Sequence, residues 1–364
     1  MKSVLMEFQK GLSELKKFIE NSQFQKKMFT TFKKSKEAGV HITPPELGEQ
    51  FKLFIEHYQS FSNKQIFEYN TIIISMYGYF EAFIEELIKA YISNLSETVS
   101  DFKKMPLKIQ ENHSALSAIL IQNLTLPKYQ NITTADKIII NAHSCVVGNG
   151  NYSINLDAYT YHTSNFRQGS IDEFFYKIGI NQVSSLILRH PGFEKYLVEN
   201  EISKAIAFGR IDDLAERRNQ VAHGGQNELL SLEILLDYIN FFELYGKTLY
   251  EVLMIEIIQF RMENSLNIRL LDLPIATYGR DIVWFNVEDT KVCVGDNIYA
   301  RTNNQSEPVR YGAIESIQFN DEQCQELIAV ESIQVGLKVN FKVRDSYTFY
   351  LEQKSDHKEI QQPV

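Results

Sequence analysis

The segment RIDDLAERRNQVAHGG, which begins at Arg210, constrains the fold more than any other part of the chain. Apolar residues recur at helical spacing from Ile211 to Val221, so the segment predicts the last turns of a helix. Gly224-Gly225 then supply the left-handed residues with which such helices end. Arg218 falls on the side of this helix that should be apolar. Because a guanidinium keeps its charge, its burial requires an acidic partner or an open cleft.

Asn219 and His223 are four residues apart and therefore neighbour each other on the adjoining helix face, and Arg217 extends the basic side. An imidazole exchanges protons near neutral pH, and the negative end of a helix favours the protonated form of His223. A guanidinium forks onto phosphate oxygens and stabilises charge that develops there. These groups could cleave RNA through its own 2′-hydroxyl. They also fit a structural role, in which His223 caps the helix and Arg218 pairs with Glu81.

The pattern Arg218-Asn219 followed by His223 resembles the HEPN superfamily of all-helical proteins, many of which are metal-independent ribonucleases. The segment around Glu81, YFEAFI, is similar to the family's earlier helix, in which an acidic residue supports the motif arginine. The resemblance implies that Arg218 contacts the scissile phosphate, that His223 transfers a proton or stabilises charge, and that Asn219 orients these groups. Arg217 and Glu81 complete the predicted catalytic set. It further implies that two protomers pack with both motifs in one cleft.

The segment from Ser164 to Ile180 is similar to the MAE-like group of bacterial HEPN nucleases, and the resemblance as a whole covers residues 50 to 263. It implies a toxin-like endoribonuclease of antiphage defence that acts as a homodimer on RNA, with tRNA or another translation RNA as the candidate substrate. An antitoxin or a phage-sensing protein is a candidate partner. The alternative is a non-catalytic HEPN module that binds a partner protein, RNA or a nucleotide.

Neither a metal nor another cofactor is expected. The cysteines Cys145, Cys293 and Cys324 lack metal-ligand spacing, and their sparse, odd number is typical of a reducing cytoplasm. His162 and His190 are isolated in the sequence, so we predict structural or surface roles for them. The N-terminus lacks the apolar core of a signal peptide, and no apolar run is long enough for a membrane span. We therefore expect a cytoplasmic protein without membrane contact.

The net charge of −9 excludes a protein that binds nucleic acid over its whole surface, so any RNA contact must use a local basic site. The first 39 residues hold nine lysines against four glutamates. This segment indicates either an arm that faces RNA or a partner, or a solvated helix face.

Apolar periodicity divides the chain into a helical part and a β part. A broad helical stripe runs from Glu228 to Met262, whereas short alternating segments with turn residues between them follow residue 280. We therefore predict an α+β protein with separate domains, namely an all-α HEPN-like bundle followed by a small antiparallel β-barrel. The predicted segments are a basic N-terminal helix that flanks or packs on the bundle (1–45), the helical domain (46–264), a linker (265–280), the barrel (281–353) and a polar tail (354–364).

The order of three segments in the predicted barrel resembles the second-domain β-barrel of translation GTPases. These segments are Val294-Gly295-Asp296, residues 311–317 and residues 335–339. The resemblance implies a domain that steers the nuclease to tRNA or ribosomal RNA, or that senses a phage component. A barrel that only packs or dimerises is the alternative.

Overall fold

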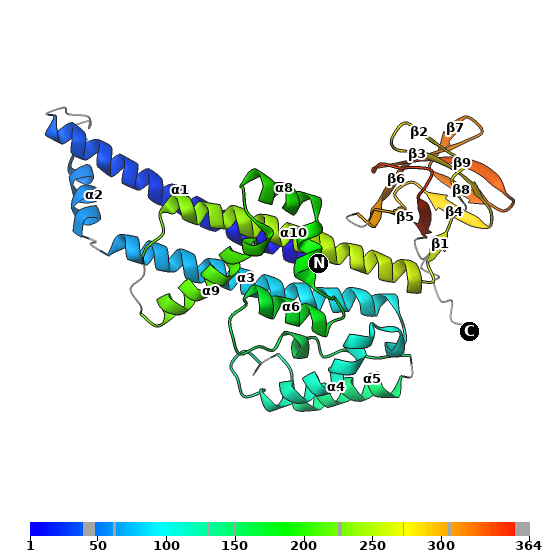
Figure 1. The fold of residues 1–364 in the computed structure, drawn as a ribbon, viewed down its shortest axis with the longest axis horizontal. Coiled ribbons are helices and arrows are strands. Elements are labelled where there is room, and N and C mark those ends of the chain that lie inside the picture. Colours follow the sequence, from blue (N-terminus) through cyan, green and yellow to red (C-terminus); the bar gives the residue numbers. More distant parts are fainter. Residues whose placement is uncertain are drawn as a thin grey trace, which may run out of the picture. The chain divides into compact units, whose positions relative to one another are not determined.

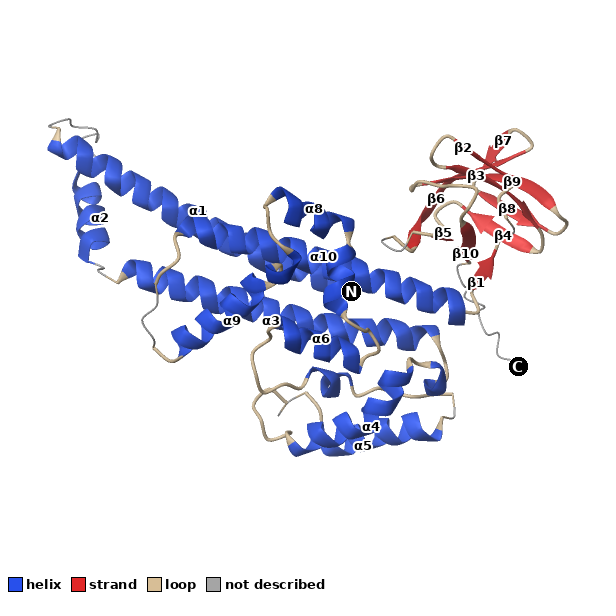
Figure 2. Ribbon diagram, in the orientation of Figure 1, coloured by secondary structure: helices blue, strands red, loops and turns tan. Residues whose placement is uncertain are grey.

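The computed structural model describes residues 1–38, 48–60, 63–129, 132–148, 150–224, 228–271, 273–304 and 307–353 (Figure 1). Helices occupy the chain before residue 265 and strands follow it (Figure 2). The predicted α+β class, with a helical N-terminal region and an antiparallel C-terminal sheet, is thereby confirmed. Gly225, the predicted boundary at residues 45 and 46, and the predicted tail 354–364 lie outside the described residues.

Long helices form where the apolar stripes were recognised. The first predicted helix corresponds to α1 (Lys2–Glu37), and the stripe that starts at Glu228 corresponds to α10 (Leu232–Asn264). Within the described ranges, no helix is long and apolar enough to cross a membrane. The remaining helices are α2 (Gly48–Ser60), α3 (Lys64–Thr98), α4 (Leu107–Gln122), α5 (Ala135–Val147), α6 (Gln168–Lys177), α7 (Val183–Arg189), α8 (Pro191–Glu199) and α9 (Gly209–Ala222), with short 3-10 turns at Phe102–Lys104, Leu156–Thr160 and Lys204–Ile206.

The chain forms two compact units. The first consists of Met1–Ala90, Leu156–Leu188 and Gly192–Tyr250, and the second of Tyr91–Asn155, Arg189–Pro191 and Glu251–Val364. The boundaries of the predicted domains stay predictions.

The core of the first unit is built where α1, α3 and α10 pack together. Phe8 of α1 stacks on Phe83 of α3 with ring centroids 4.3 Å apart, and Phe80 of α3 meets Phe242 of α10 edge to face at 4.9 Å. Gly246 permits this close approach, because a Cβ atom there would lie 2.6 Å from the ring of Phe8. These buried rings remove large apolar areas from water and fix the helices that carry the candidate site.

The β part of the second unit is an antiparallel half-barrel. Its described strands pair in the order β1-β10-β5-β6-β9-β3-β2, with β7 on β6 and a separate β4-β8 pair, so β1 and β2 stand at the two ends of the path. The strands are β1 (Ile268–Leu270), β2 (Ala276–Tyr278), β3 (Ile282–Val287), β4 (Thr290–Cys293), β5 (Asn297–Arg301), β6 (Val309–Phe319), β7 (Glu322–Cys324), β8 (Glu326–Ala329), β9 (Ile333–Val339) and β10 (Thr348–Glu352).

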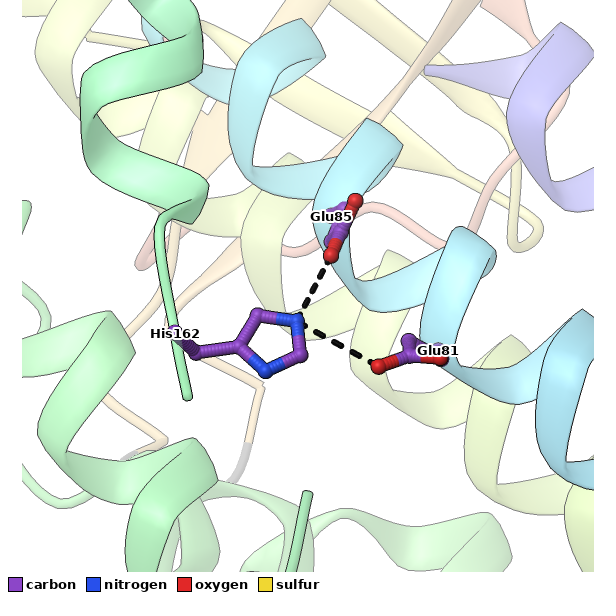
Figure 3. Close-up of side chains that lie close together, drawn as sticks. All are labelled: Glu81, Glu85 and His162. Atoms are coloured by element: carbon purple, nitrogen blue, oxygen red, sulfur yellow. Dashed lines mark hydrogen bonds and ion pairs between the residues drawn. The ribbon is translucent and has the colours of Figure 1, made fainter. Parts of the chain in front are cut away.

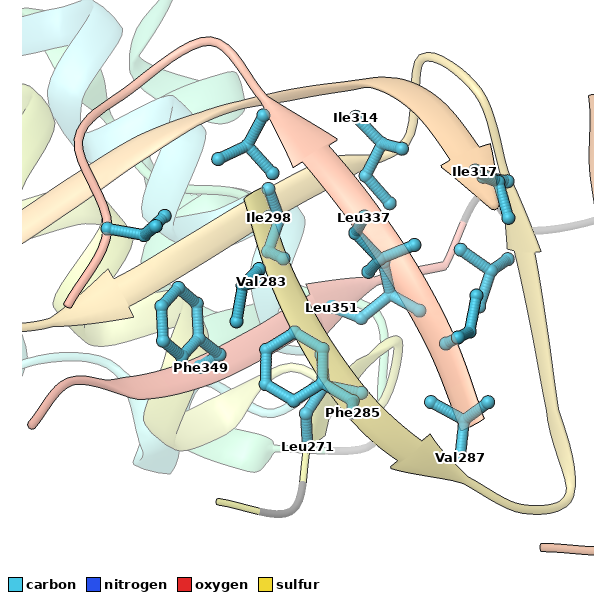
Figure 4. Close-up of a cluster of buried hydrophobic side chains, with 14 of the residues drawn as sticks. Leu271, Val283, Phe285, Val287, Ile298, Ile314, Ile317, Leu337, Phe349 and Leu351 are labelled. Atoms are coloured by element: carbon cyan, nitrogen blue, oxygen red, sulfur yellow. The ribbon is translucent and has the colours of Figure 1, made fainter. Parts of the chain in front are cut away.

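Curvature of this sheet comes from its longest strand. The first half of β6 pairs with β5 and the second half with β9, and the register shifts between Ile314 and Ser316. Such an irregularity bends a strand and increases its twist. Alternate residues Val283, Phe285 and Val287 of β3 point into the apolar core, in which they meet side chains of the other strands (Figure 4).

Candidate functional site

Helix α9 carries buried apolar residues in its earlier turns, whereas the residues of its last turn are half-buried or exposed. Ile211, Leu214 and Ala215 are buried, whereas Arg218 is half-buried and Ala222 is exposed. The predicted apolar stripe therefore fades in the last turn, which carries the Arg-Asn-x-x-x-His motif.

The predicted helix end is confirmed. His223 is the C-cap residue, and its backbone N–H donates to the carbonyl oxygen of Asn219 at 3.0 Å. Gly224 follows in the left-handed region with φ of 70°. The side chain of His223 is exposed, so its imidazole is available to solvent and ligands.

The guanidinium of Arg218 lies over the ring of Tyr77 of α3, 5.4 Å from the ring centroid. Burial, with a contribution from the nearby Glu81 carboxylate, raises the pKa of the Tyr77 phenol, so this hydroxyl stays protonated at neutral pH. Arg218 also lines an open pocket of about 680 Å³. The other lining residues are Thr163, Ser164, Asn165, Arg167, Gly169, Ser170, Glu173, Asp212 and Asn219. A half-buried cation in a polar, solvent-connected pocket is suited to binding an anion.

A short loop joins the motif helix to α3. The side-chain nitrogen of Asn165 donates to Oδ1 of Asn219 at 2.6 Å and to the carbonyl oxygen of Ala215 at 3.2 Å. The next residue, Phe166, donates its backbone N–H to the Tyr77 hydroxyl at 2.8 Å. Asn219 also lines the pocket, and in the described part of the chain no acceptor is in place for its amide nitrogen. This loop is the segment Ser164-Asn165-Phe166 that the sequence singled out.

Arg217 has a different environment from Arg218. Its Nε donates to Oδ2 of Asp213 at 2.6 Å, and Nη1 donates to the Tyr69 hydroxyl at 2.9 Å and to the Glu228 carbonyl oxygen at 3.1 Å. Burial disfavours the charge of Arg217, but its bonds to Tyr69 and Asp213 outweigh this and raise the pKa of the guanidinium. Its side chain is 18% exposed, so these contacts occupy Arg217 within the protein.

Glu81 does not pair with Arg218 in the described part of the chain. Its Oε1 lies 3.4 Å from Nε2 of His162, which also contacts Oε1 of Glu85 at 2.7 Å (Figure 3). The cause is helical spacing, since Glu81 and Glu85 present their carboxylates on one face of α3 toward His162, whereas Arg218 lies one turn earlier over Tyr77.

Tyr77 and His162 are the neighbours of the site that the sequence did not reveal. Tyr77 stands four residues before Glu81, so helical spacing could have assigned it to the same face. His162 is 81 residues away from Glu81 in the chain and carries no such signal. His162 is isolated in the sequence, but the fold places its ring beside the carboxylates of Glu81 and Glu85.

An all-helical region whose motif helix ends in Arg-Asn-x-x-x-His, beside a polar pocket, defines a protein of the HEPN class. Residues 45–254, more than half of the chain, match the family model described as RiboL-PSP-HEPN, and the chain belongs to this family. The predicted HEPN relationship is confirmed. No curated protein matches the chain.

Proposed function

We propose that this protein is a metal-independent HEPN endoribonuclease. HEPN families often contain ribonucleases, and the observation that carries the proposal is the end of α9. There, Arg218 and Asn219 line an open polar pocket and His223 follows as an exposed imidazole. A phosphate anion in this pocket would meet the guanidinium without displacing an acidic partner of Arg218.

The cleavage step uses the 2′-hydroxyl of the RNA. Its oxygen gives up its proton to an acceptor and attacks the adjacent phosphorus, the bond to the 5′-oxygen breaks, and that oxygen takes a proton from a donor. Arg218 holds the non-bridging oxygens as negative charge builds on them, and His223 transfers a proton or stabilises the charge. The amide nitrogen of Asn219 orients the phosphate. Arg217 and Glu81 act as positioning residues through Asp213 and His162 respectively.

One motif supplies a single imidazole, whereas the reaction needs both a proton acceptor and a proton donor. We therefore propose a homodimer in which a second copy places its motif across the same cleft. The wider role is that of a toxin in antiphage defence, restrained by an antitoxin or triggered through a phage-sensing partner. The half-barrel would steer the nuclease to tRNA or another translation RNA, in line with its resemblance to the barrel of translation GTPases. The resemblance of the segment from Ser164 to Ile180 to the MAE-like nucleases supports this proposal.

The test is RNA cleavage by purified wild-type protein and His223→Ala in the presence of a chelator. We expect the wild type to leave 2′,3′-cyclic phosphate and 5′-hydroxyl ends, and the variant to cleave at least about 100-fold more slowly. The melting temperature of the variant should match that of the wild type, because His223 is exposed.

His143→Ala is the matched control, since His143 is also an exposed histidine near the end of a helix. It should cleave like the wild type. Equal cleavage by His223→Ala, or 5′-phosphate ends on the products, would contradict the proposed reaction.

A non-catalytic HEPN module is the second candidate. It is favoured by a structural role of the motif, because Oδ1 of Asn219 holds the loop by accepting a hydrogen bond from Asn165. Expression of wild type and His223→Ala in bacteria separates the two. A nuclease toxin slows growth and degrades total RNA only as the wild type, whereas a binding module leaves RNA intact in both strains.

A further inference from the structure

Three potential metal ligands converge beside α3 in the first unit. Glu81 and Glu85 are four residues apart on this helix, so their carboxylates share one face. His162 meets them with Nε2, and the three ligand atoms all lie within 4.8 Å of one another (Figure 3). Within the described ranges, this is the group of histidine and acidic residues with the geometry to hold a metal ion.

The other ring nitrogen of His162 fixes how the imidazole is presented. Nδ1 lies 2.8 Å from the carbonyl oxygen of Ser164, which can only accept, so Nδ1 carries a proton. In the protonated ring Nε2 donates to the carboxylates, and when the ring is neutral Nε2 directs a lone pair toward them, where a metal ion could replace the proton. Metal-ligating histidines are oriented in this way, with the second nitrogen donating to a backbone carbonyl.

Three electron-rich atoms that face one another favour a positive charge between them, either a proton on Nε2 of His162 or a bound metal ion. The side chains of His162 and Glu85 are each 10% exposed, so water screens their charges poorly. Glu81 is 31% exposed and leaves one side accessible to an entering ion. The neighbouring Arg218 lies over Tyr77.

We propose that Glu81, Glu85 and His162 bind a divalent transition-metal ion of the Zn²⁺ or Mn²⁺ type. Bonds of about 2.0–2.2 Å to an ion place neighbouring ligand atoms roughly 3 Å apart. The Nε2-to-oxygen distances of 2.7 and 3.4 Å match this spacing after small side-chain movements. One imidazole with two carboxylates suits Zn²⁺ or Mn²⁺ better than Mg²⁺ or Ca²⁺, which prefer oxygen ligands alone. Three protein ligands leave a coordination position for water.

The ion would tie α3 to the segment that runs from His162 to Phe166 and lines the Arg218 pocket. The segment is also held without metal, through the bonds of Phe166 to Tyr77 and of Asn165 to Asn219. The site therefore adds stability to the loop and supplies no chemistry to the proposed RNA cleavage. Metal binding and ribonuclease activity can succeed or fail separately.

The test starts from full-length protein stripped of metal with a chelator. Titration calorimetry with Zn²⁺ and with Mn²⁺ should give about one tight site per chain, and saturating Zn²⁺ should raise the melting temperature by several degrees. Mg²⁺ should do neither. The variants His162→Ala and Glu85→Gln should weaken Zn²⁺ binding by at least about 100-fold and remove the shift in melting temperature.

His190→Ala is the matched control, because His190 contacts one carboxylate, Glu251, at 3.0 Å and lies outside the three-ligand cluster. It should bind Zn²⁺ like the wild type. If Glu85→Gln fails to fold, as its circular dichroism would reveal, the more exposed Glu81→Gln takes its place. Wild-type protein that binds no Zn²⁺, or binding that these ligand variants leave intact, would overturn the proposal.

Discussion

Two clusters of asparagine and histidine in this protein have opposite surroundings. At the end of α9, His223 is exposed and Asn219 is half-buried, with one bond from Asn165. In the second unit, His113 and Asn155 are buried, with 1% and 6% of their surface exposed. The same two residue types are thus placed against solvent in one unit and inside the protein in the other.

In the buried cluster, the polar groups of Asn155 are hydrogen-bonded inside the protein. Asn155 donates its backbone N–H to Nε2 of His113 at 3.0 Å, and its side-chain nitrogen donates to Ser117 Oγ and the Ile138 carbonyl oxygen, both at 2.9 Å. Its Oδ1 accepts from Asn141 at 2.9 Å. Because leaving such groups unpaired away from water is costly, each of these bonds helps to specify the fold.

The difference teaches which polar residues are candidates for function. A residue such as Asn155, whose bonding capacity is filled inside the protein, stabilises the native state. A cation such as Arg218, held against a ring and facing an open pocket, retains donors for a ligand. Exposure to solvent and to an open pocket, rather than residue type, separates the two clusters.

The largest expected effect is on activity. Arg218→Ala should slow RNA cleavage by about 100- to 1,000-fold, because it removes the positive charge that stabilises the developing phosphate charge. Its melting temperature should change little, since among the described residues Arg218 has no carboxylate partner whose charge would be left unpaired. The measurement is the initial rate of RNA cleavage, alongside thermal unfolding.

Arg189→Ala provides the control, as Arg189 is an exposed arginine at the end of α7. It should cleave at the wild-type rate. A large loss of stability in Arg218→Ala would erase the contrast with the buried cluster, since the open pocket would then be part of the structural core.

The sequence predicted the helices and the sheet class well because both follow from local apolar periodicity. The apolar stripe of α10 and the alternation of apolar and polar residues in β9 can both be recognised in the sequence. The sequence did not reveal that the sheet is a half-barrel with open edges. Closure of a barrel depends on which strands meet across long sequence distances. The bulge between Ile314 and Ser316, which bends β6, leaves no distinct signal in the sequence.

The motif residues of α9 were recognised as a set, but their separate environments were not. Arg217 and Arg218 are adjacent in sequence, so helical geometry turns them to different neighbours, which are Asp213 on one side and Tyr77 on the other. The partner of Glu81 was wrongly expected to be the motif arginine. His162 could be placed there only by the path of the chain after residue 155, which local pattern does not determine.

The next effect concerns pH. Burial lowers the pKa of His113 to about 4 from its ordinary 6.5, so the ring is neutral in the native state. Above pH 6.5 His113 is neutral in both the native and the unfolded protein. The free energy of unfolding is then not reduced by protonation of this residue. As the pH falls from 6.5 toward 4, the unfolded chain binds a proton that the native protein does not, and the free energy of unfolding should fall by about 3 kcal/mol from this residue.

Chemical denaturation at several pH values between 7 and 4 measures this dependence. His113→Gln removes the titrating group, so the wild type should lose more stability than the variant over this range. Parallel curves for wild type and His113→Gln would contradict a neutral, buried His113.

The smallest expected effect tests whether the open cluster carries any structural energy. The bond from Asn165 to Asn219 spans a partly exposed site, so a double-mutant cycle of Asn165→Ala and Asn219→Ala should give a coupling energy of about 1 kcal/mol in unfolding. Asn219→Ala should also slow RNA cleavage, since it removes the amide nitrogen that is proposed to orient the phosphate, whereas Asn165→Ala should act mainly through stability. A coupling several times larger, with equal loss of activity in both single variants, would mean that the loop and the motif form one rigid structural unit like the cluster around Asn155.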